Sequence, residues 1–286
     1  MRRYLSSLIL GSCLCVAVAA TGSIGVIRSS GDFRVDGSMM RGNGTVFDGN
    51  VVETTAARSV VQLGAGQVTL APESRAKFYR DRTVLEKGAG LLRDADKHVF
   101  EAASLQVSPA GKDAVIQVDV QGPGRIAVAA RSGSAFVRSA SGILVAHLDP
   151  GMALAFEPQV GGSTAVKITG VVEQRNGLYF VTDPTTHVTS QLLGSNLAQY
   201  VGKRVEITGS LVPGATPGAG ATQVVQAAGF KVLAAAGGAG GAAAGGAGVA
   251  GAHTATIAII AGVAVGGTVV GLVSAGSFSS SSTSTP

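Results

Sequence analysis

Residues Ile116-Gln117-Val118-Asp119-Val120 decide the fold class of this chain. Apolar and polar side chains alternate along them, and this period of two is typical of a β-strand that is buried on one face. The alternation returns in three further pairs of apolar residues: Val61 and Leu63, Val68 and Leu70, and Ile126 and Val128. No stretch of the body keeps a helical period for three turns, so the sequence predicts an all-β protein.

Composition narrows the kind of core and the kind of partner. The 286 residues include 42 Gly and no Trp, so we expect cores of Val, Leu, Ile and Ala on many short strands. The only cysteines are Cys13 and Cys15, so the rest of the chain can form neither a disulfide nor a thiolate metal site. Without Arg2 and Arg3 the formal charge falls from +5 to +3, which is too mild to favour nucleic acid as a partner.

Residues 1–20 have the pattern of a secretory signal peptide. The basic Met1-Arg2-Arg3 precedes an apolar stretch at 5–18, and Ala17-Val18-Ala19 fits the site at which such a peptide is cut. Two alternatives stay open, namely an uncleaved anchor helix and a lipoprotein that is acylated at Cys13. The pattern predicts export to the periplasm or cell envelope.

The first domain, residues 21–160, contains an ordered set of turns and strands. Gly49-Asn50-Val51-Val52-Glu53-Thr54 is followed by an aliphatic strand, a glycine turn, a second strand and then Pro72-Glu73-Ser74. This order resembles the periplasmic FecR-type domain over about Gly31 to Gly151, with Asn50 in place of the usual Asp. The strand and turn pattern of this domain predicts a β-sandwich, roll or solenoid. The resemblance implies an all-β envelope domain that contacts a protein or ligand and carries no catalytic residue.

In the founding members of that family, the domain relays an outer-membrane signal to a sigma factor through a cytoplasmic helical arm. Only about three residues precede the apolar N-terminal segment here. We therefore expect a binding or scaffold module in preference to a regulator.

The second domain, residues 163–233, has the pattern of five short strands with a turn or helix at Asn196 to Tyr200. The expected strands are Val166–Val172, Leu178–Thr182, Val188–Leu193, Val205–Leu211 and Gln223–Leu233. This pattern resembles a small OB-fold barrel of the bacterial envelope type.

OB-folds often bind single-stranded nucleic acid by stacking bases on aromatic rings above a basic groove. Tyr179 and Phe180 are adjacent, so in one strand they point to opposite faces and cannot form a platform together. The domain has five basic residues against three acidic ones: Lys167, Arg175, Lys203, Arg204 and Lys231 against Glu173, Asp183 and Glu206. We expect no nucleic-acid partner.

No charged residue follows Lys231, and three segments make up this end of the chain. Residues 234–253 consist almost entirely of Gly and Ala, which predicts a flexible linker. Residues 254–276 are uncharged and would span ~34 Å as a helix, which is enough for a membrane span. The small residues Gly262, Gly266, Gly267 and Gly271 would give such a helix a ridge for self-association. The alternative is an apolar tail without fixed structure, which would continue into the Ser/Thr-rich residues 277–286.

Few residues of the sequence are candidates for a chemical role. Ser74 and Lys77 fit the S-x-x-K spacing, but in a strand they point to opposite faces. The alternate residues Asp94, Asp96 and His98 could share a strand face and bind a divalent cation, although a solvated charged turn is the more ordinary interpretation. The other histidines, His147, His187 and His253, are isolated in the sequence and are expected at the surface. We therefore predict no catalytic, cofactor-binding or metal-binding residue, and no cofactor.

Three hypotheses for function follow. The first is an exported, non-enzymatic envelope protein that binds an envelope protein or a polysaccharide, or acts as a scaffold, and contacts the membrane through residues 254–276. The second is a periplasmic signal sensor of the FecR type, which regulates a sigma factor. The third is a hydrolase of envelope polymers, which is disfavoured because no motif supplies paired acid and base residues.

Overall fold

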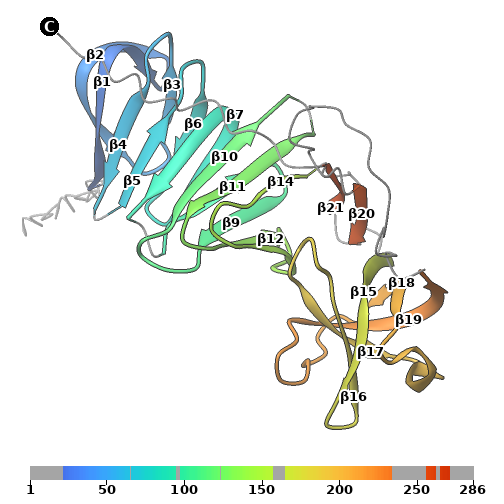
Figure 1. The fold of residues 1–286 in the computed structure, drawn as a ribbon. Coiled ribbons are helices and arrows are strands. Elements are labelled where there is room, and N and C mark those ends of the chain that lie inside the picture. The colour runs from blue at the N-terminus through green and yellow to red at the C-terminus, as the bar shows by residue number, and fades with distance from the viewer. Residues whose placement is uncertain are drawn as a thin grey trace, which may run out of the picture.

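The computed structural model describes residues 22–64, 66–94, 97–122, 124–156 and 165–233, together with the backbone of 256–261 and 265–270. Strands make up most of these residues, which confirms the predicted all-β fold (Figure 1). Four predicted features lie outside the described residues: the signal peptide at 1–20, the domain boundary near 158–164, the linker at 234–253 and the tail at 277–286.

Fourteen strands belong to one large sheet. They are β1 (Ser23–Val35), β2 (Ser38–Phe47), β3 (Val51–Thr54), β4 (Ser59–Leu63), β5 (Gly66–Leu70), β6 (Arg75–Phe78), β7 (Arg82–Arg93), β8 (Val99–Ala102), β9 (Leu105–Pro109), β10 (Val115–Val120), β11 (Ile126–Ser132), β12 (Ala135–Ser139), β13 (Leu144–Leu148) and β14 (Ala153–Phe156). The long strand β7 pairs with β6 and β8 along its first half and with β5 and β10 along its second half.

Six of these strands close into an antiparallel ring. Around the ring, β7 pairs with β5, β5 with β4, β4 with β1, β1 with β3, β3 with β6, and β6 again with β7. Beyond the ring, β8, β9, β12 and β13 extend one branch of the sheet, and β10, β11 and β14 extend another. Ring and branches share one hydrophobic core, in which Phe33, Phe78, Phe100 and Phe156 are fully buried.

The predicted alternation on β10 is present. Ile116 and Val118 belong to the core, and Gln117 and Asp119 point to the opposite face of the sheet.

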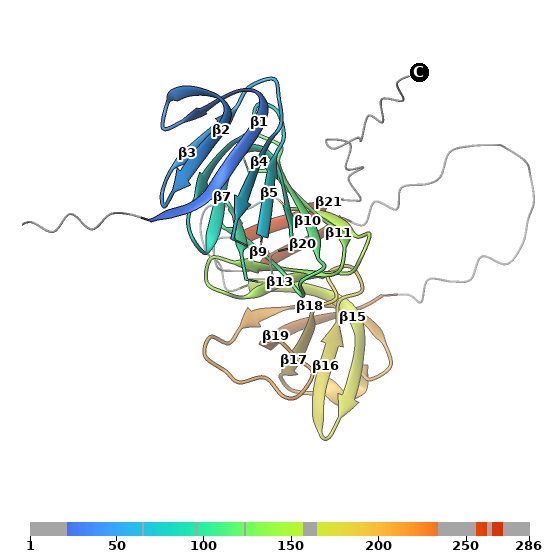
Figure 2. The ribbon, with the colours of Figure 1, turned by 90° about the vertical axis from the view of Figure 1, so that its left-hand side faces the viewer.

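The remaining five strands of the body form a closed barrel (Figure 2). They are β15 (Ala165–Arg175), β16 (Leu178–Thr182), β17 (Thr189–Leu193), β18 (Arg204–Leu211) and β19 (Gln223–Val232), with a short 3-10 helix, η1 (Leu197–Tyr200), between β17 and β18. The strand order is β15-β16-β17-β19-β18, β18 returns to β15, and β17 runs parallel to β19. The predicted five-stranded OB-like barrel is thus confirmed.

The predicted C-terminal helix at 254–276 is wrong for the residues described there. They form two antiparallel strands, β20 (Thr256–Ala261) and β21 (Val265–Val270). Ile, Val and Thr dominate both strands, and β-branched residues favour strands over helices. Gly266 and Gly267 lie in the extended strand β21, so they do not form part of a helical ridge. Gly262 and Gly271 lie outside the described residues. In the described part of the chain, no helix is long and apolar enough to cross a membrane.

Candidate binding site between the two domains

The residues that carry the FecR-type resemblance form a buried hydrogen-bond network. The Thr54 hydroxyl donates to the Ala71 carbonyl oxygen at 2.6 Å and accepts from the Ser74 amide at 2.8 Å. The Ser74 hydroxyl accepts from the Ala89 amide at 3.0 Å. Gly88, at φ 79°, leaves room for this serine, because a Cβ there would lie 2.3 Å from the Ser74 Oγ. These side chains therefore hold strands together, and the resemblance itself stays a prediction.

The S-x-x-K pair does not meet, as the strand geometry predicts. Ser74 is 1 % exposed and faces the core, on the same side as the next two inward residues of β6. Lys77 lies on the other face, where its ammonium is 5.2 Å from the centre of the Tyr79 ring.

The possible cation site around His98 is not assembled. The described residues between β7 and β8 do not form a strand, so Asp94 and His98 do not share a strand face. Asp94 adopts a left-handed conformation at φ 53°, and Asp96 lies outside the described residues. The buried His98 ring instead lies 2.8 Å from the Thr83 hydroxyl, and burial lowers its pKa. Within the described ranges, no group of three metal-ligating side chains occurs.

Two of the histidines lie where the sheet meets the barrel. His187 is exposed, as the sequence predicts, and His147 is half-buried. The His147 amide donates to the Thr186 carbonyl oxygen at 2.7 Å, and its ring stacks on Phe136 with the centroids 4.8 Å apart. The His187 Nδ1 lies 2.7 Å from the Asp149 Oδ2. These contacts join the β13 end of the sheet to the turn between β16 and β17. His253 lies outside the described residues.

The barrel turn that receives these contacts is fixed by its own aspartate. Asp183 is 3 % exposed, and its Oδ1 accepts from the Thr185 amide at 2.8 Å and from the Thr186 amide at 3.1 Å. Carboxylates that bind their own backbone a few residues ahead are typical of tight turns, and Pro184 completes this one. The Thr186 carbonyl is therefore held in place for the His147 amide.

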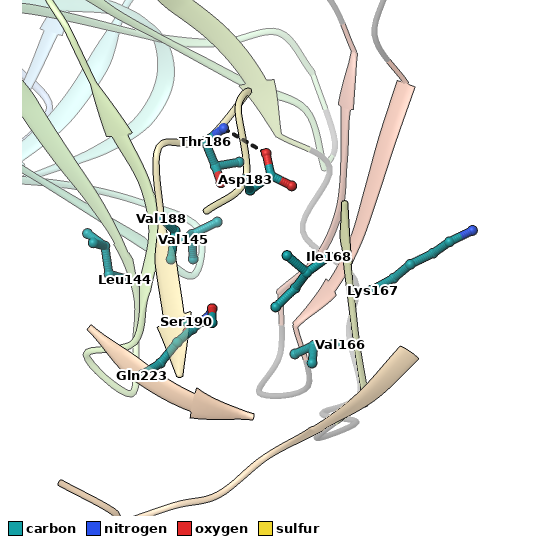
Figure 3. A pocket seen from close by; sticks show the side chains of 10 residues that line it. All are labelled: Leu144, Val145, Val166, Lys167, Ile168, Asp183, Thr186, Val188, Ser190 and Gln223. Carbon is teal, nitrogen blue, oxygen red and sulfur yellow. Dashed lines mark hydrogen bonds between the residues drawn. The ribbon is translucent and has the colours of Figure 1, made fainter. Parts of the chain in front are cut away.

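Apolar side chains complete the junction. Ile143, from the turn between β12 and β13, packs against the barrel core. Behind it, Leu144 and Val145 face barrel residues across a cavity of about 20 Å³, and Lys167 points its ammonium away (Figure 3). That volume is enough for one water molecule but not for a larger ligand.

A larger groove opens beside this junction, with a volume of about 320 Å³. One wall is the β12–β13 turn, and the other is the loop between β18 and β19. The lining residues are Ser141, Gly142, Ile143, Leu144, Leu211, Val212, Pro213, Gly214, Ala215, Thr222, Gln223 and Val224. None of these lining residues is charged, so the groove suits an uncharged ligand.

Hydrogen bonds fix both walls of the groove in advance. In the turn, the Ser139 hydroxyl lies 2.7 Å from that of Ser141 and accepts from the Ile143 amide at 3.2 Å. In the loop, the Val212 amide donates to the Val224 carbonyl oxygen at 3.0 Å. A preformed site loses less entropy on binding than a loop that must first order.

The usual OB ligand surface, the outer face of strands two and three, is covered by the same loop. The Gly218 amide donates to the Gln191 Oε1 at 2.6 Å, and a Cβ on Gly218 would lie only 2.8 Å from the Leu178 side chain. Beneath this loop Phe180 is 2 % exposed, whereas Tyr179 packs toward the barrel core. The two rings thus point to opposite faces as predicted, and Phe180 offers no exposed ring for stacking.

Sequence pattern alone could not find the groove, because its walls are about 70 residues apart in the chain. The only sequence signals were turn formers, such as Gly142 and Pro213-Gly214. No protein-family model matches this chain, and no curated protein matches it at a significant level.

Proposed function

We propose that the chain is an exported, non-enzymatic binding or scaffold protein of the cell envelope, with the groove between the two domains as its binding site. The observation that supports this proposal best is the position of the groove between a turn of the sheet and a loop of the barrel. Ligand sites occur preferentially at such domain interfaces. A ligand bound there contacts both domains and stabilises their junction.

The lining indicates the class of ligand. Ser141, Thr222 and Gln223 supply hydroxyl and amide groups, and Ile143 and Val212 supply apolar surface. The volume lies near the lower end of the range for small-molecule sites, which is roughly 300–1,000 Å³. An N-acetylated disaccharide or a short uncharged peptide from an envelope polymer meets both conditions.

The two alternative functions make different demands. A hydrolase needs a general base beside its substrate, and the lining residues of the groove include no carboxylate or imidazole. A FecR-type sensor needs an output, so ligand binding would have to shift the chain between two conformational states.

Two variants in the same loop test the groove. Ala215→Trp places an indole in the groove from an exposed lining position, and Ala219→Trp places the same group on the loop outside the lining. The probes are an N-acetylated disaccharide and an uncharged extended tetrapeptide, titrated by calorimetry. We expect one probe to bind the wild type and Ala219→Trp, with at least tenfold weaker binding to Ala215→Trp. Equal binding by both variants, or no binding of either probe, contradicts the groove assignment, and turnover of a probe favours the hydrolase.

Export is tested separately by intact-mass analysis of the protein recovered from its host. We expect a chain that starts near Ala20 or Thr21, in the periplasmic or envelope fraction. A retained Met1 contradicts cleavage, and a lipidated Cys13 favours the lipoprotein alternative.

A further inference from the structure

The outer face of the β7–β10–β11–β14 branch, away from the core, is built from two cross-strand rows of mostly small residues. In the first row, residues paired across neighbouring strands are Thr69, Leu91, Gln117, Ala129 and Ala153. The second row is Ala89, Asp119, Ala127 and Ala155. We call these nine residues the alanine face, because Ala occupies five of the positions.

The alanine face is buried, although it belongs to neither hydrophobic core. The inward residues of the same strands are members of the large core, and no residue of the alanine face is a member of either cluster. Even so, Leu91 is 6 % exposed, Gln117 3 % and Ala155 0 %. The Arg131 guanidinium donates to the Gln117 Oε1 at 2.6 Å and accounts for part of the burial of that residue. A leucine on a solvent-facing sheet surface would still be far more exposed than Leu91, so another part of the chain covers this face.

The backbone of the C-terminal hairpin lies at this edge of the body. β14, the last strand of the branch, pairs with β11, and β21 runs beside β14 while β20 runs beside β15 (Figure 1). We propose that the C-terminal segment, residues 254–276, docks on the alanine face of its own chain and forms an intramolecular cover.

The chemistry of the two surfaces matches. The alanine face presents short side chains, so a covering strand can approach more closely than the ~10 Å usual for packed sheets. The C-terminal segment carries no charge and is rich in Gly, Ala, Val and Ile. Residues 234–253 connect the barrel to the C-terminal segment and can extend over more than about 60 Å. They are therefore long enough for the segment to reach the alanine face. Burial also raises the pKa of Asp119, the one carboxylate on the face, which agrees with a cover above it.

Cysteine labelling tests the cover, because Cys13→Ser with Cys15→Ser removes every native thiol from the full chain. In this background three single cysteines report on three environments. Ala129→Cys lies on the alanine face, Val118→Cys lies in the core, and Met39→Cys lies at a site that is 56 % exposed.

The docking is broken by Val269→Asp with Val270→Asp, because two charges within this uncharged segment oppose its burial against the sheet. Ser279→Asp with Ser280→Asp adds the same charge to the same end of the chain outside residues 254–276, and serves as the matched control. The readout is the rate of maleimide labelling at several protein concentrations.

We expect Ala129→Cys to react at least tenfold more slowly than Met39→Cys, and to react at least tenfold faster once Val269 and Val270 are replaced. The Ser279 and Ser280 control should leave the rate unchanged, and Val118→Cys should stay protected throughout, which shows that the body remains folded. Three results overturn the proposal. These are labelling of Ala129→Cys as fast as Met39→Cys, protection that survives the two Val replacements, and protection that grows with protein concentration, which would assign the cover to a second copy.

Discussion

Thr54→Val tests whether the residues of the FecR-type motif serve the fold. Valine keeps the size and β-branching of threonine, so the change leaves no cavity. It removes the hydroxyl that bonds the Ala71 carbonyl at 2.6 Å and the Ser74 amide at 2.8 Å, and both groups are buried. Each unsatisfied buried group costs about 1–3 kcal/mol, which gives about 2–6 kcal/mol for the pair. For a domain of this size that loss lowers Tm by roughly 4 °C per kcal/mol, so by at least about 8 °C.

The neighbouring residue provides the control. The Thr55 hydroxyl donates to the Asp32 carbonyl oxygen at 2.6 Å in an exposed setting, where water can replace it. Thr55→Val should therefore cost no more than about 1 kcal/mol. Thermal and urea unfolding, followed by circular dichroism, give both values in the same buffer. If the two variants unfold within about 0.5 kcal/mol of each other, the buried network does not stabilise the domain and the reasoning fails.

Three further predictions concern charge. Asn50→Asp should destabilise the protein by about 1–2 kcal/mol at neutral pH, because the Asn50 amide donates to the Asp36 carboxylate at 2.6 Å and a second carboxylate would repel that of Asp36. Urea unfolding of this variant and of the control Asn43→Asp measures the loss, and equal losses in the two variants would contradict the prediction. Asp119→Asn should raise Tm at pH 7. The pKa of Asp119 is raised in the folded state, which therefore binds the proton more tightly, so stability falls as pH rises from the ordinary value of 3.8 toward the raised one. The gain in Tm should vanish below pH 3.8, and a gain that persists there would refute the assignment. The pKa of His98 is lowered in the folded state, so its effect on stability is opposite to that of Asp119. Stability should be lost as pH falls from 6.5 toward the lowered value. His98→Gln should reduce the pH dependence of the urea midpoint between pH 7 and 5, and an unchanged dependence would show that another group titrates.

The barrel was the part of the fold that sequence pattern predicted most closely. Leu178–Thr182 has the predicted bounds, and the predicted strand at Val205–Leu211 begins one residue earlier, at Arg204. Short strands between strong turn signals leave few alternatives, so local pattern suffices there. The six-strand ring was not predictable in the same way, because β7 changes partners along its length at a bulge near Gly88, and no local pattern reports which strands it meets.

In the C-terminal segment, one apolar run fits both a membrane helix and a buried strand. Its 23 uncharged residues meet the length for a membrane helix. Short apolar runs fit a buried strand equally well, and β-branched residues should have shifted the choice toward strands. The Ile257-Ala258-Ile259-Ile260 stretch of β20 is such a run.

The alanine face was signalled in the sequence, but by a different feature from the alternation that predicts a half-buried strand. Ile126-Ala127-Val128-Ala129-Ala130 and Ala153-Leu154-Ala155-Phe156 contain no polar residue on either face. Continuous apolar runs are typical of strands that are buried on both sides, whereas Ile116 to Val120 next to them alternates. A strand that is apolar on both faces, at the end of a branch and next to an alternating strand, requires a cover on its outer side. Residues 254–276 are uncharged and rich in Gly, Ala, Val and Ile, so they match this face chemically. The labelling of Ala129→Cys therefore decides between a docked and a free segment.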